Sequence, residues 1–307
     1  MVKICDVKTI LTKSNLPVAD FSVNPYVGCT HACKYCYASF MKRFTNHPEP
    51  WGEFLDVKIW PEIKNAHKYA GKEAFIGSVT DPYQPCEEKY KRTRAVLEQL
   101  EGSGISISIA TKSDLVLRDK DLIRTFPNAR VSLSINTLDE DFRREMDRAV
   151  SIERRLSAMK ELYEAGIQTT CFISPIFPGI TDVKAIIERA KEFCNLVWLE
   201  NLNLRGDYKA RILDWIHETH TELDGLYHEI YSQGSREYWT KLDQEMKLYT
   251  AHEGMPYLRD NDQSRANFGE PPVVVNYFYH EEVKKSAKKS GEKSGKGSVK
   301  DSVSIKS

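Results

Sequence analysis

Short apolar or β-branched runs alternate along the chain with longer stretches of helical period. The strand-like runs begin near Phe21, Phe75, Ile105, Val131, Thr169 and Val197. A typical helical stretch carries apolar residues at i, i+4, i+7 and i+11, namely Ile152, Leu156, Met159 and Tyr163. Gly166 follows where a helix C-terminal cap belongs. This alternation predicts a parallel sheet with helices packed on its outside.

Polar residues share one parity in these runs. In the run from 105 to 112, isoleucines alternate with Ser106, Ser108, Ala110 and Lys112. In the next run, Val131, Leu133 and Ile135 alternate with Ser132, Ser134 and Asn136. If helices cover the apolar face, the polar face points into a barrel, and its small side chains predict an open lumen that holds a polar molecule. A solvent-facing antiparallel sheet also alternates, but the helical stretches between the runs favour the barrel.

The chain is long enough for one α/β barrel domain with additions. We expect an N-terminal segment at 1–15, the barrel at 16–205 and a mainly helical extension covering the barrel at 206–283. Gly254, Pro256, Gly269, Pro271 and Pro272 interrupt that extension before a strand-like run from Val273 to Tyr279. The Lys/Ser/Gly-rich tail at 284–307 cannot bury apolar surface and is expected to be disordered.

The formal charges cancel, with 44 basic and 44 acidic residues, so net charge gives no reason to expect a nucleic acid or a membrane. Eight lysines lie in the tail from Lys284 onward. No run approaches the ~20 apolar residues of a membrane span, and the N-terminus lacks a signal-peptide core. We expect a cytoplasmic protein, and the seven cysteines suit reduced thiols better than a disulfide framework.

Three cysteines crowd together directly after the first strand-like run, in Gly28-Cys29-Thr-His-Ala-Cys33-Lys-Tyr-Cys36-Tyr37. A [4Fe-4S] cubane needs four external ligands, so Cys29, Cys33 and Cys36 would leave one iron for a chelating ligand. The amino and carboxylate groups of S-adenosylmethionine (SAM) suit that iron, and an electron from the cluster can then release a 5′-deoxyadenosyl radical.

The alternative interpretation is a zinc site or an electron-transfer cluster whose fourth ligand is Cys5, His31 or Cys86. Structural zinc sites commonly use paired CxxC or Cys/His knuckles, and the sequence contains no second CxxC.

These residues resemble the radical SAM superfamily. Asn24-Pro-Tyr-Val-Gly-Cys29 with Cys36-Tyr-Ala resembles its spore photoproduct lyase-related, DNA repair photolyase-like branch. The match extends through Thr80-Asp-Pro-Tyr-Gln-Pro85, Thr111-Lys-Ser113 and Ser132-Leu-Ser-Ile-Asn136. The resemblance implies a partial (β/α)6 barrel of the TIM type, a [4Fe-4S] cluster, SAM, and a reductant such as flavodoxin or ferredoxin. The longer run that continues from this motif to Lys42-Arg-Phe also resembles proteins described as radical SAM mobile pair protein B. That resemblance implies a second radical SAM protein as partner.

The resemblance also assigns SAM contacts. It implies that Tyr35 and the turn from Ile176 to Gly179 support the adenine, and that the segment with Gly77, Ser78 and Asp81 binds the amino end. Lys112 would pair with the SAM carboxylate, and Ser134 and Asn136 would bond the ribose or the methionyl group. Lys112 could instead be an ordinary strand-end lysine, and Asp81 an Asx-turn residue before Pro82.

The sequence indicates the residues that transfer hydrogen atoms less clearly than the cluster ligands. The lyases place a hydrogen-donating cysteine near the end of the second strand, where this sequence has Ser78, with Cys86 eight residues later. This departure argues against photoproduct repair itself and leaves Cys86 as the candidate hydrogen donor. Tyr37 could relay a radical or simply pack beside the cluster.

The substrate class that the resemblance implies is a nucleic acid or a nucleotide-like molecule. The basic run Lys89-Tyr-Lys-Arg-Thr-Arg94, the pair Lys42-Arg43 and the lysine tail could meet phosphates. A solvated helix face explains the first run equally well. Trp51, Trp60, Trp215 and Trp239 could stack bases, although aromatic residues on helical patterns are more often core. The open alternatives are the same radical chemistry on a peptide or small molecule, and a noncatalytic iron-sulfur or zinc protein.

Overall fold

The structure is a computed structural model that describes residues 2–16, 19–259 and 273–280. The expected disorder of the tail at 284–307 lies outside these residues. The interruptions expected at Gly269, Pro271 and Pro272 lie outside them as well.

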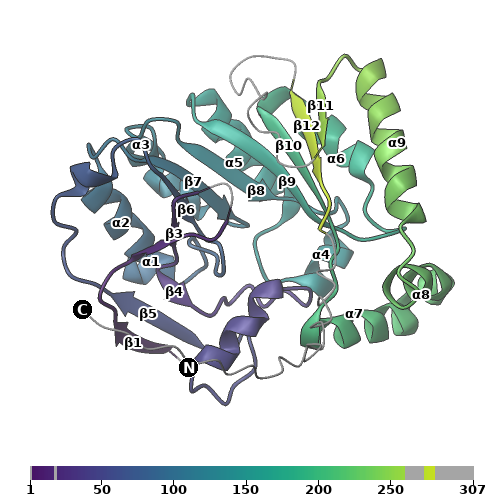
Figure 1. Cartoon of the computed structure of the whole chain (residues 1–307), viewed down its shortest axis with the longest axis horizontal. Coiled ribbons are helices and arrows are strands. Elements are labelled where there is room, and N and C mark those ends of the chain that lie inside the picture. Colours follow the sequence, from purple (N-terminus) through teal and green to yellow (C-terminus); the bar gives the residue numbers. More distant parts are fainter. Residues whose placement is uncertain (1, 17–18, 260–272, 281–307) are drawn as a thin grey trace, which may run out of the picture.

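A curved sheet forms the centre of the described chain (Figure 1). Its nine strands follow the order β11-β12-β10-β9-β8-β7-β6-β3-β2. Their bounds are β2 Leu11–Lys13, β3 Phe21–Val23, β6 Glu73–Ile76, β7 Ser106–Thr111, β8 Arg130–Ser134, β9 Gln168–Ile176, β10 Leu196–Asn201, β11 Tyr257–Arg259 and β12 Val274–Phe278. All neighbours are parallel except β2 and β3. All of the strand-like runs predicted from the sequence are confirmed as strands of this sheet.

Helices alternate with the strands, as the sequence predicts. Their bounds are α1 Glu87–Tyr90, α2 Arg92–Leu100, α3 Lys120–Ile123, α4 Glu140–Met146, α5 Ile152–Glu164, α6 Val183–Ala190, α7 Gly206–Thr219, α8 Asp224–Tyr231 and α9 Glu237–His252. Helix α5 packs on β8 and β9, and α6 packs on β9. The expected helical extension is formed by α7, α8 and α9, which follow one another along the edge of the molecule in Figure 1.

Short 3-10 helices and a second small sheet complete the described elements. The 3-10 helices are η1 Tyr37–Phe44, η2 Ala66–Tyr69, η3 Asp114–Asp119, η4 Lys191–Phe193 and η5 Thr221–Leu223. The small sheet has the order β1-β5-β4, formed by Val2–Asp6, Leu55–Ile59 and Tyr26–Val27. This sheet was not predicted from the sequence, because it pairs segments more than 45 residues apart, Val2–Asp6 with Leu55–Ile59.

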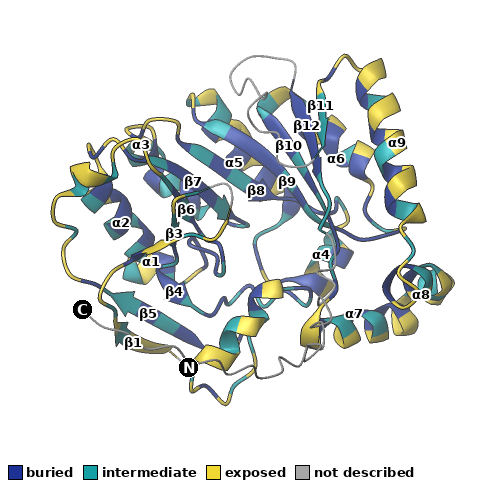
Figure 2. Cartoon of the chain, in the orientation of Figure 1, coloured by how far each residue is buried: buried dark blue, intermediate teal, exposed yellow. Residues whose placement is uncertain are grey.

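The two faces of the central sheet differ as the parity predicts. Ile107, Ile109, Val131 and Leu133 are fully buried in the main core. Ser132 pairs in register with Ala110 and Thr170, so these three side chains share the opposite face. We call that face, which the polar parity occupies, the inner face. Figure 2 shows the sheet as mostly buried, while α8 and α9 expose residues on their outer sides.

The C-terminal strand is part of the main sheet. The sequence suggested that the run from Val273 to Tyr279 belongs to an extension covering the barrel, but β12 lies parallel to β10 and extends the sheet beyond it. A free edge of β10 would expose unpaired backbone groups, and β12 satisfies them. The inner face therefore includes residues that come from the far C-terminal part of the described chain.

No helix in the described part of the chain is long and apolar enough to cross a membrane.

The difference between the faces predicts different costs of truncation within one strand. Replacing Leu133 by Ala removes a fully buried side chain from the helix-covered face and is expected to lower the free energy of unfolding by about 2–5 kcal/mol. Replacing its neighbour Ser132 by Ala removes a half-buried hydroxyl from the inner face and is expected to change it by less than about 1 kcal/mol. Urea denaturation measures both, and equal losses would contradict the assignment of faces.

Candidate active site

The cysteine loop, residues 28–36, connects β4 to η1 and contains three thiols. Cys29 and Cys33 are buried, and Cys36 is half-buried. The loop begins at Gly28, whose φ of +93° is one that L side chains rarely adopt. A Cβ at Gly28 would lie 2.3 Å from the carbonyl oxygen of Phe54, so only glycine fits there.

Residues after β6 hold one side of the cysteine loop. The Thr80 hydroxyl donates to the Gly28 carbonyl at 2.6 Å, and the Gln84 amide donates to the same oxygen at 3.2 Å. The side-chain oxygen of Gln84 accepts from the Thr30 N–H at 2.9 Å. Gln84 is fully buried. Gln84 lies in the segment 80–85 that carries the family resemblance, but its role as an anchor of the loop is visible only in the structure.

A segment after α4 holds the other side. The Lys34 N–H donates to the Met146 carbonyl at 2.9 Å, and the Arg148 N–H donates to the His31 carbonyl at 2.8 Å. The loop is thus bonded to two regions that are more than 60 residues apart in the chain. Its backbone conformation depends on the tertiary structure and not on local turns alone.

The three thiols lie within electrostatic reach of one another. Burial raises the pKa of Cys29, and the charges of Asp81, Cys33 and Cys36 raise it further. Burial also raises the pKa of Cys33 and Cys36, which Lys112 opposes in both cases. Thiolates in such a place need a compensating positive charge, and a bound metal centre deprotonates its coordinating thiols.

Within the described residues, no group of three or more His, Cys, Asp or Glu side chains converges as it would around one metal ion. Convergence on one point is what a zinc ion requires of its ligands. The irons of a cubane lie at separate corners, and each thiolate binds its own iron. Three neighbouring thiols on one loop therefore suit a cubane without meeting at a single point.

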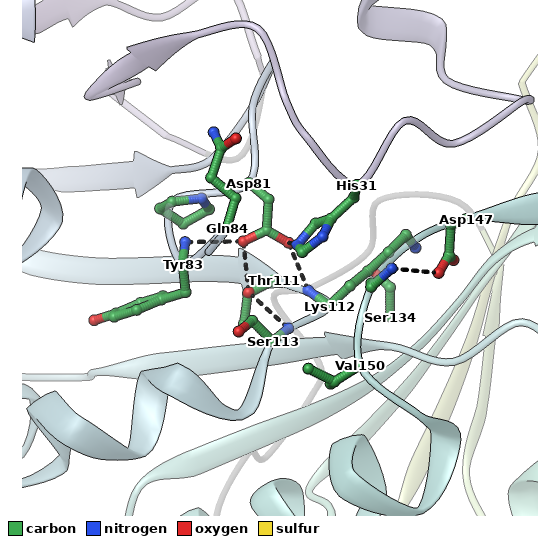
Figure 3. Close-up of polar contacts among 12 residues, drawn as sticks. His31, Asp81, Tyr83, Gln84, Thr111, Lys112, Ser113, Ser134, Asp147 and Val150 are labelled. Carbon is green, nitrogen blue, oxygen red and sulfur yellow. Dashed lines mark hydrogen bonds and ion pairs between the residues drawn. The ribbon is translucent and has the colours of Figure 1, made fainter. Parts of the chain in front are cut away.

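Asp81 is the centre of a buried polar network (Figure 3). Its carboxylate accepts hydrogen bonds from the Tyr83 N–H at 2.9 Å, the Thr111 hydroxyl at 2.7 Å and the Lys112 N–H at 2.7 Å. Nε2 of the buried His31, which belongs to the cysteine loop, lies 3.1 Å from Oδ2. Asp81 therefore ties the cysteine loop to the end of β7.

The same contacts keep Asp81 ionised. Burial raises the pKa of its carboxyl, but His31 and the hydrogen bonds from Lys112 and Thr111 lower it by more, so the pKa lies below its usual value. The bond from the Tyr83 N–H is the Asx turn that the sequence offers as the alternative for Asp81. The contacts with His31 and Thr111 add a long-range structural role. The expected contact of Asp81 with the amino end of SAM stays a prediction.

The strand ends around Asp81 are closely packed. Gly77 has φ +98°, and a Cβ there would lie 2.8 Å from the Ala110 carbonyl oxygen. The hydroxyl of Ser78 accepts a hydrogen bond from the Asn24 amide at 2.8 Å. Gly77 and Ser78 thus belong to the C-terminal end of the sheet, as predicted, and Asn24 is an added partner that lies in the motif Asn24-Pro-Tyr.

Tyr35 and Lys112 meet on the inner side of the cysteine loop. Nζ of Lys112 lies 5.6 Å from the centre of the Tyr35 ring. The Tyr35 hydroxyl donates to Asp147 at 3.3 Å, and Asp147 forms an ion pair of 2.9 Å with Arg155 of α5. The structure therefore brings together two residues that the resemblance assigns to SAM, and it adds a buried ion pair behind them.

Arg155 is the largest fully buried side chain in the described chain. Its guanidinium donates to the carbonyls of Ser134 at 3.1 Å and Val150 at 2.9 Å, as well as to Asp147. Burial raises the pKa of Asp147, but Arg155 and Lys112 lower it by more, so the carboxyl titrates below its usual range. Arg155 was not among the predicted site residues, although an arginine on the apolar stripe of α5, three residues after Ile152, is a signal of a buried charge.

Asn136 lies at the C-terminal end of β8 with an unused hydrogen-bonding group. The residue is 2% exposed, and its side-chain nitrogen has no hydrogen-bond partner among the described residues. Its carbonyl accepts a hydrogen bond from Thr181 at 2.9 Å. Ser134, which was predicted to act with Asn136, is 8% exposed on the inner face. Buried amides are normally paired, so this nitrogen suits a polar ligand such as the ribose or methionyl group of SAM.

The two candidates for hydrogen transfer lie in different surroundings. The Tyr37 hydroxyl donates to the Ser78 carbonyl, while 58% of the residue is exposed. Cys86 precedes α1 and packs against the small core of Tyr26, Leu55 and Val57. Burial and the charge of Glu87 raise the pKa of Cys86 to about 12. Neither placement tests the proposed radical relay or hydrogen donation, and both roles stay predictions.

Two arginines of the basic run at 89–94 contact other side chains of the protein. The Arg92 guanidinium lies 5.3 Å from the Trp60 ring centre, and Arg94 forms a 2.7 Å ion pair with Asp119. Trp60, Trp215 and Trp239 are buried, so they belong to the core. The lysine tail lies outside the described residues.

Comparison with known proteins agrees with this site. The sequence model described as the radical SAM superfamily matches residues 23–190, which include all three cysteines of the loop. An uncharacterised protein of Methanocaldococcus jannaschii is 41% identical over 202 residues, covering 65% of this chain and 76% of the relative. A protein of Pseudomonas phage M6 named radical SAM Nalpha-GlyT isomerase is 26% identical over 172 residues, covering 54% of this chain and 35% of the relative.

Among solved structures, a cysteine-to-serine mutant of spore photoproduct lyase superposes with a TM-score of 0.53 at 16% identity. The superposition covers 69% of this chain and 65% of the lyase chain. A cysteine-to-alanine mutant of spore photoproduct lyase with dinucleoside spore photoproduct gives the same TM-score at 15% identity. At these identities the likeness concerns the fold, and this chain spans about 65% of the lyase length.

The Asp147–Arg155 pair predicts a strong contrast between two adjacent arginines of α5. Replacing Arg155 by Met leaves Asp147 charged and buried, and is expected to lower the free energy of unfolding by about 3–5 kcal/mol. Replacing Arg154 by Met breaks only its surface pair with Asp114 and is expected to cost no more than about 1 kcal/mol. Chemical denaturation compares the two variants, and similar losses of unfolding free energy would contradict a structural role for Arg155.

Proposed function

The chain belongs to the radical SAM superfamily, and we propose that it cleaves SAM at a [4Fe-4S] cluster held by Cys29, Cys33 and Cys36 and directs the 5′-deoxyadenosyl radical at a nucleic-acid or nucleotide-like substrate. Its cofactors are those of the family, the cluster and SAM. They supply the radical chemistry, and the chain's own residues must bind and orient them and exclude water.

The observation that carries this proposal is the attachment of the cysteine loop to the C-terminal ends of the parallel strands. Thr80, Asp81 and Gln84 anchor the loop there. Active sites of α/β barrels gather at that end, because successive loops meet there. A cluster on these thiols would face the inner side of the sheet.

The inner face also offers groups for SAM. Lys112 carries a positive charge beside Tyr35, which suits a carboxylate, and the unpartnered amide nitrogen of Asn136 suits a hydroxyl or carboxylate oxygen. The Asp147–Arg155 pair orients Tyr35 through its hydroxyl. Each of these groups is supported from behind by buried contacts, as a preorganised site requires.

The substrate class is supported by an exposed aromatic and basic surface on η1. Phe40 and Phe44 are 41% and 66% exposed, and the Arg43 guanidinium lies 5.3 Å and 4.7 Å from their ring centres. Exposed rings interleaved with cations are a common surface for single-stranded nucleic acid, because bases stack on rings and phosphates pair with cations. The helix follows Cys36 directly, so a strand bound there would lie beside the cysteine loop.

The name of one solved structure supports a nucleotide-like substrate, and the name of one relative supports the radical chemistry. The lyase structures include one with dinucleoside spore photoproduct, and the phage relative is named as an isomerase of Nalpha-GlyT. The proposal also includes an external one-electron reductant such as flavodoxin or ferredoxin, and a second radical SAM protein as partner. Its setting would be the cytoplasm, where thiols stay reduced.

Loss of one cluster ligand tests the cofactor chemistry. We expect the anaerobically reconstituted protein, given dithionite and SAM, to form 5′-deoxyadenosine, and Cys33→Ala to lower the rate at least about a hundredfold because one iron loses its ligand. Liquid chromatography with mass spectrometry quantifies the product. Cys194→Ala is the matched control, since Cys194 is a buried cysteine after η4 that is absent from the cysteine loop.

Product formation that survives in Cys33→Ala would overturn the ligand assignment. An intact [4Fe-4S] spectrum without any product, even when oligonucleotides are added, would favour the noncatalytic alternative.

The surface of η1 generates a second prediction. We expect Phe44→Ala and Arg43→Gln to weaken binding of a fluorescent single-stranded oligonucleotide by about threefold to tenfold each, because one loses a stacking ring and the other a cation. The slope of affinity against salt is expected to fall only for Arg43→Gln. Leu248→Ala and Lys247→Gln on α9 are matched controls, since both side chains are exposed. Fluorescence anisotropy measures binding, and unchanged affinity in both η1 variants would contradict this surface.

A further inference from the structure

A cluster of polar and aromatic side chains occupies the inner face on the C-terminal side of the sheet. We call it the Glu200 wall, and it consists of Ser174, Trp198, Glu200, Phe278 and His280. The carboxylate of Glu200 accepts hydrogen bonds from the Ser174 hydroxyl at 2.8 Å and the Trp198 indole at 2.9 Å. Nε2 of His280 lies 3.2 Å from the same carboxylate. Sequence analysis assigned a role to none of these residues.

Strand register assigns the wall to the inner face. Trp198 pairs with Phe172 of β9 and with Asn276 of β12, and Glu200 pairs with Phe278. Phe172 in turn pairs with Ser134, which is one of the polar residues of the inner face. Paired residues of parallel strands project on the same side, so the wall and the candidate SAM residues share one face.

The wall is held in place but remains accessible. The Glu200 side chain is 19% exposed and the His280 side chain 36% exposed. The side-chain oxygen of Asn201 accepts a hydrogen bond from the His280 N–H at 2.7 Å and thereby fixes the end of β12 against β10. The wall is therefore built from rigid strands, which is where precise binding sites are best supported.

Unpartnered polar groups lie on the same face. Asn276, beside Trp198 in register, is 2% exposed, and neither its amide nitrogen nor its oxygen has a partner among the described residues. The hydroxyl of Thr170, which is 3% exposed, has no partner there either. Buried polar atoms without partners are uncommon and point to a ligand that supplies the missing hydrogen bonds.

The wall lies close to the predicted SAM residue Ser134 of β8. Trp198 of β10 pairs in register with Phe172 of β9, and Phe172 pairs with Ser134 of β8. Because neighbouring strands of a sheet lie about 5 Å apart, the wall and Ser134 occupy adjacent parts of the inner face. A molecule bound on the wall would have its reactive part near the SAM residues.

The wall provides a ligand with one hydrogen-bond acceptor position and two flat rings. An ionised carboxylate can accept about four hydrogen bonds; the Ser174 hydroxyl and the Trp198 indole occupy two positions and His280 Nε2 lies beside a third, so about one remains. The Trp198 and Phe278 ring centres are 6.1 Å apart with a 39° tilt, and the His280 ring meets Phe278 edge-on at 4.6 Å. These features suit a flat ring that stacks and donates one N–H.

We propose that the Glu200 wall is the subsite that binds the base of the substrate, stacking it on Trp198 and Phe278 and accepting its Watson–Crick N–H on Glu200. This inference rests on the proposed function and names the part of the substrate that this face recognises. An organic ammonium ion fits less well, because the rings do not enclose a cage.

Nucleotide binding to the reconstituted holoenzyme with SAM tests the wall. The probes are the four 2′-deoxynucleoside 5′-monophosphates and the N3-methylated form of the thymidine nucleotide, measured by isothermal titration calorimetry. We expect at least one unmodified nucleotide to bind, and Glu200→Gln and Phe278→Leu each to weaken it by about tenfold. Glu237→Gln, an exposed carboxylate on α9, is the matched control and should not change the affinity.

Methylation gives a second and independent readout. If the thymine N–H reaches Glu200, N3-methylation should weaken binding to the wild type and cause a smaller further loss in Glu200→Gln, because the glutamine amide has one acceptor oxygen in place of two and its NH2 opposes the N–H. Circular dichroism melting checks that each variant is folded. Phe278→Leu keeps the inference testable if Glu200→Gln does not fold.

Several outcomes would overturn the assignment of the wall as the base-binding subsite. If nucleotides bind equally to the wild type and to both variants, the base lies elsewhere. If no nucleotide binds, or spermidine binds in its place, while 5′-deoxyadenosine formation still depends on Cys33, the nucleobase assignment fails and the radical chemistry stands. Loss of 5′-deoxyadenosine formation with intact nucleotide binding would instead count against the proposed function alone.

Discussion

The attachment of the cysteine loop to the ends of the parallel strands is the constraint on which the rest of the site depends. Gln84 and Asp81 are buried polar groups whose partners lie in the loop, and a buried polar group without its partners would cost about 1–3 kcal/mol. The loop conformation is therefore coupled to the sheet. Three thiols with raised pKa values are stable there, but their thiolates need a positive centre.

The sheet divides structural and chemical tasks between its faces. The helix-covered face is a continuous apolar core, and it allows the inner face to carry polar groups that do not satisfy one another. Buried Arg155 joins the two sides, because it lies on α5 yet bonds the Ser134 carbonyl and Asp147 behind Tyr35. The cofactor site and the Glu200 wall then lie on one rigid surface, with β12 supplying its last part.

Much of the fold and part of the site could be predicted from the sequence. Alternation of strand-like and helical runs identified the parallel strands, and the parity of Ser132 and Ser134 identified the polar face. The spacing of Cys29, Cys33 and Cys36 led to the superfamily that the comparison then showed. Such features are local, because side-chain periodicity and ligand spacing are properties of short segments.

Long-range partners were decided by the tertiary structure alone. No pattern around Gln84 or Asp147 indicates that one clamps the cysteine loop and the other bonds Tyr35, since these pairs are 54 and 112 residues apart. The pairing of β12 with β10, and with it the wall of Trp198, Glu200 and Phe278, likewise depends on which strand edges meet after folding. The sequence by itself determined the kind of chemistry through local spacing, whereas the choice of supporting and substrate-facing residues followed from packing between distant segments.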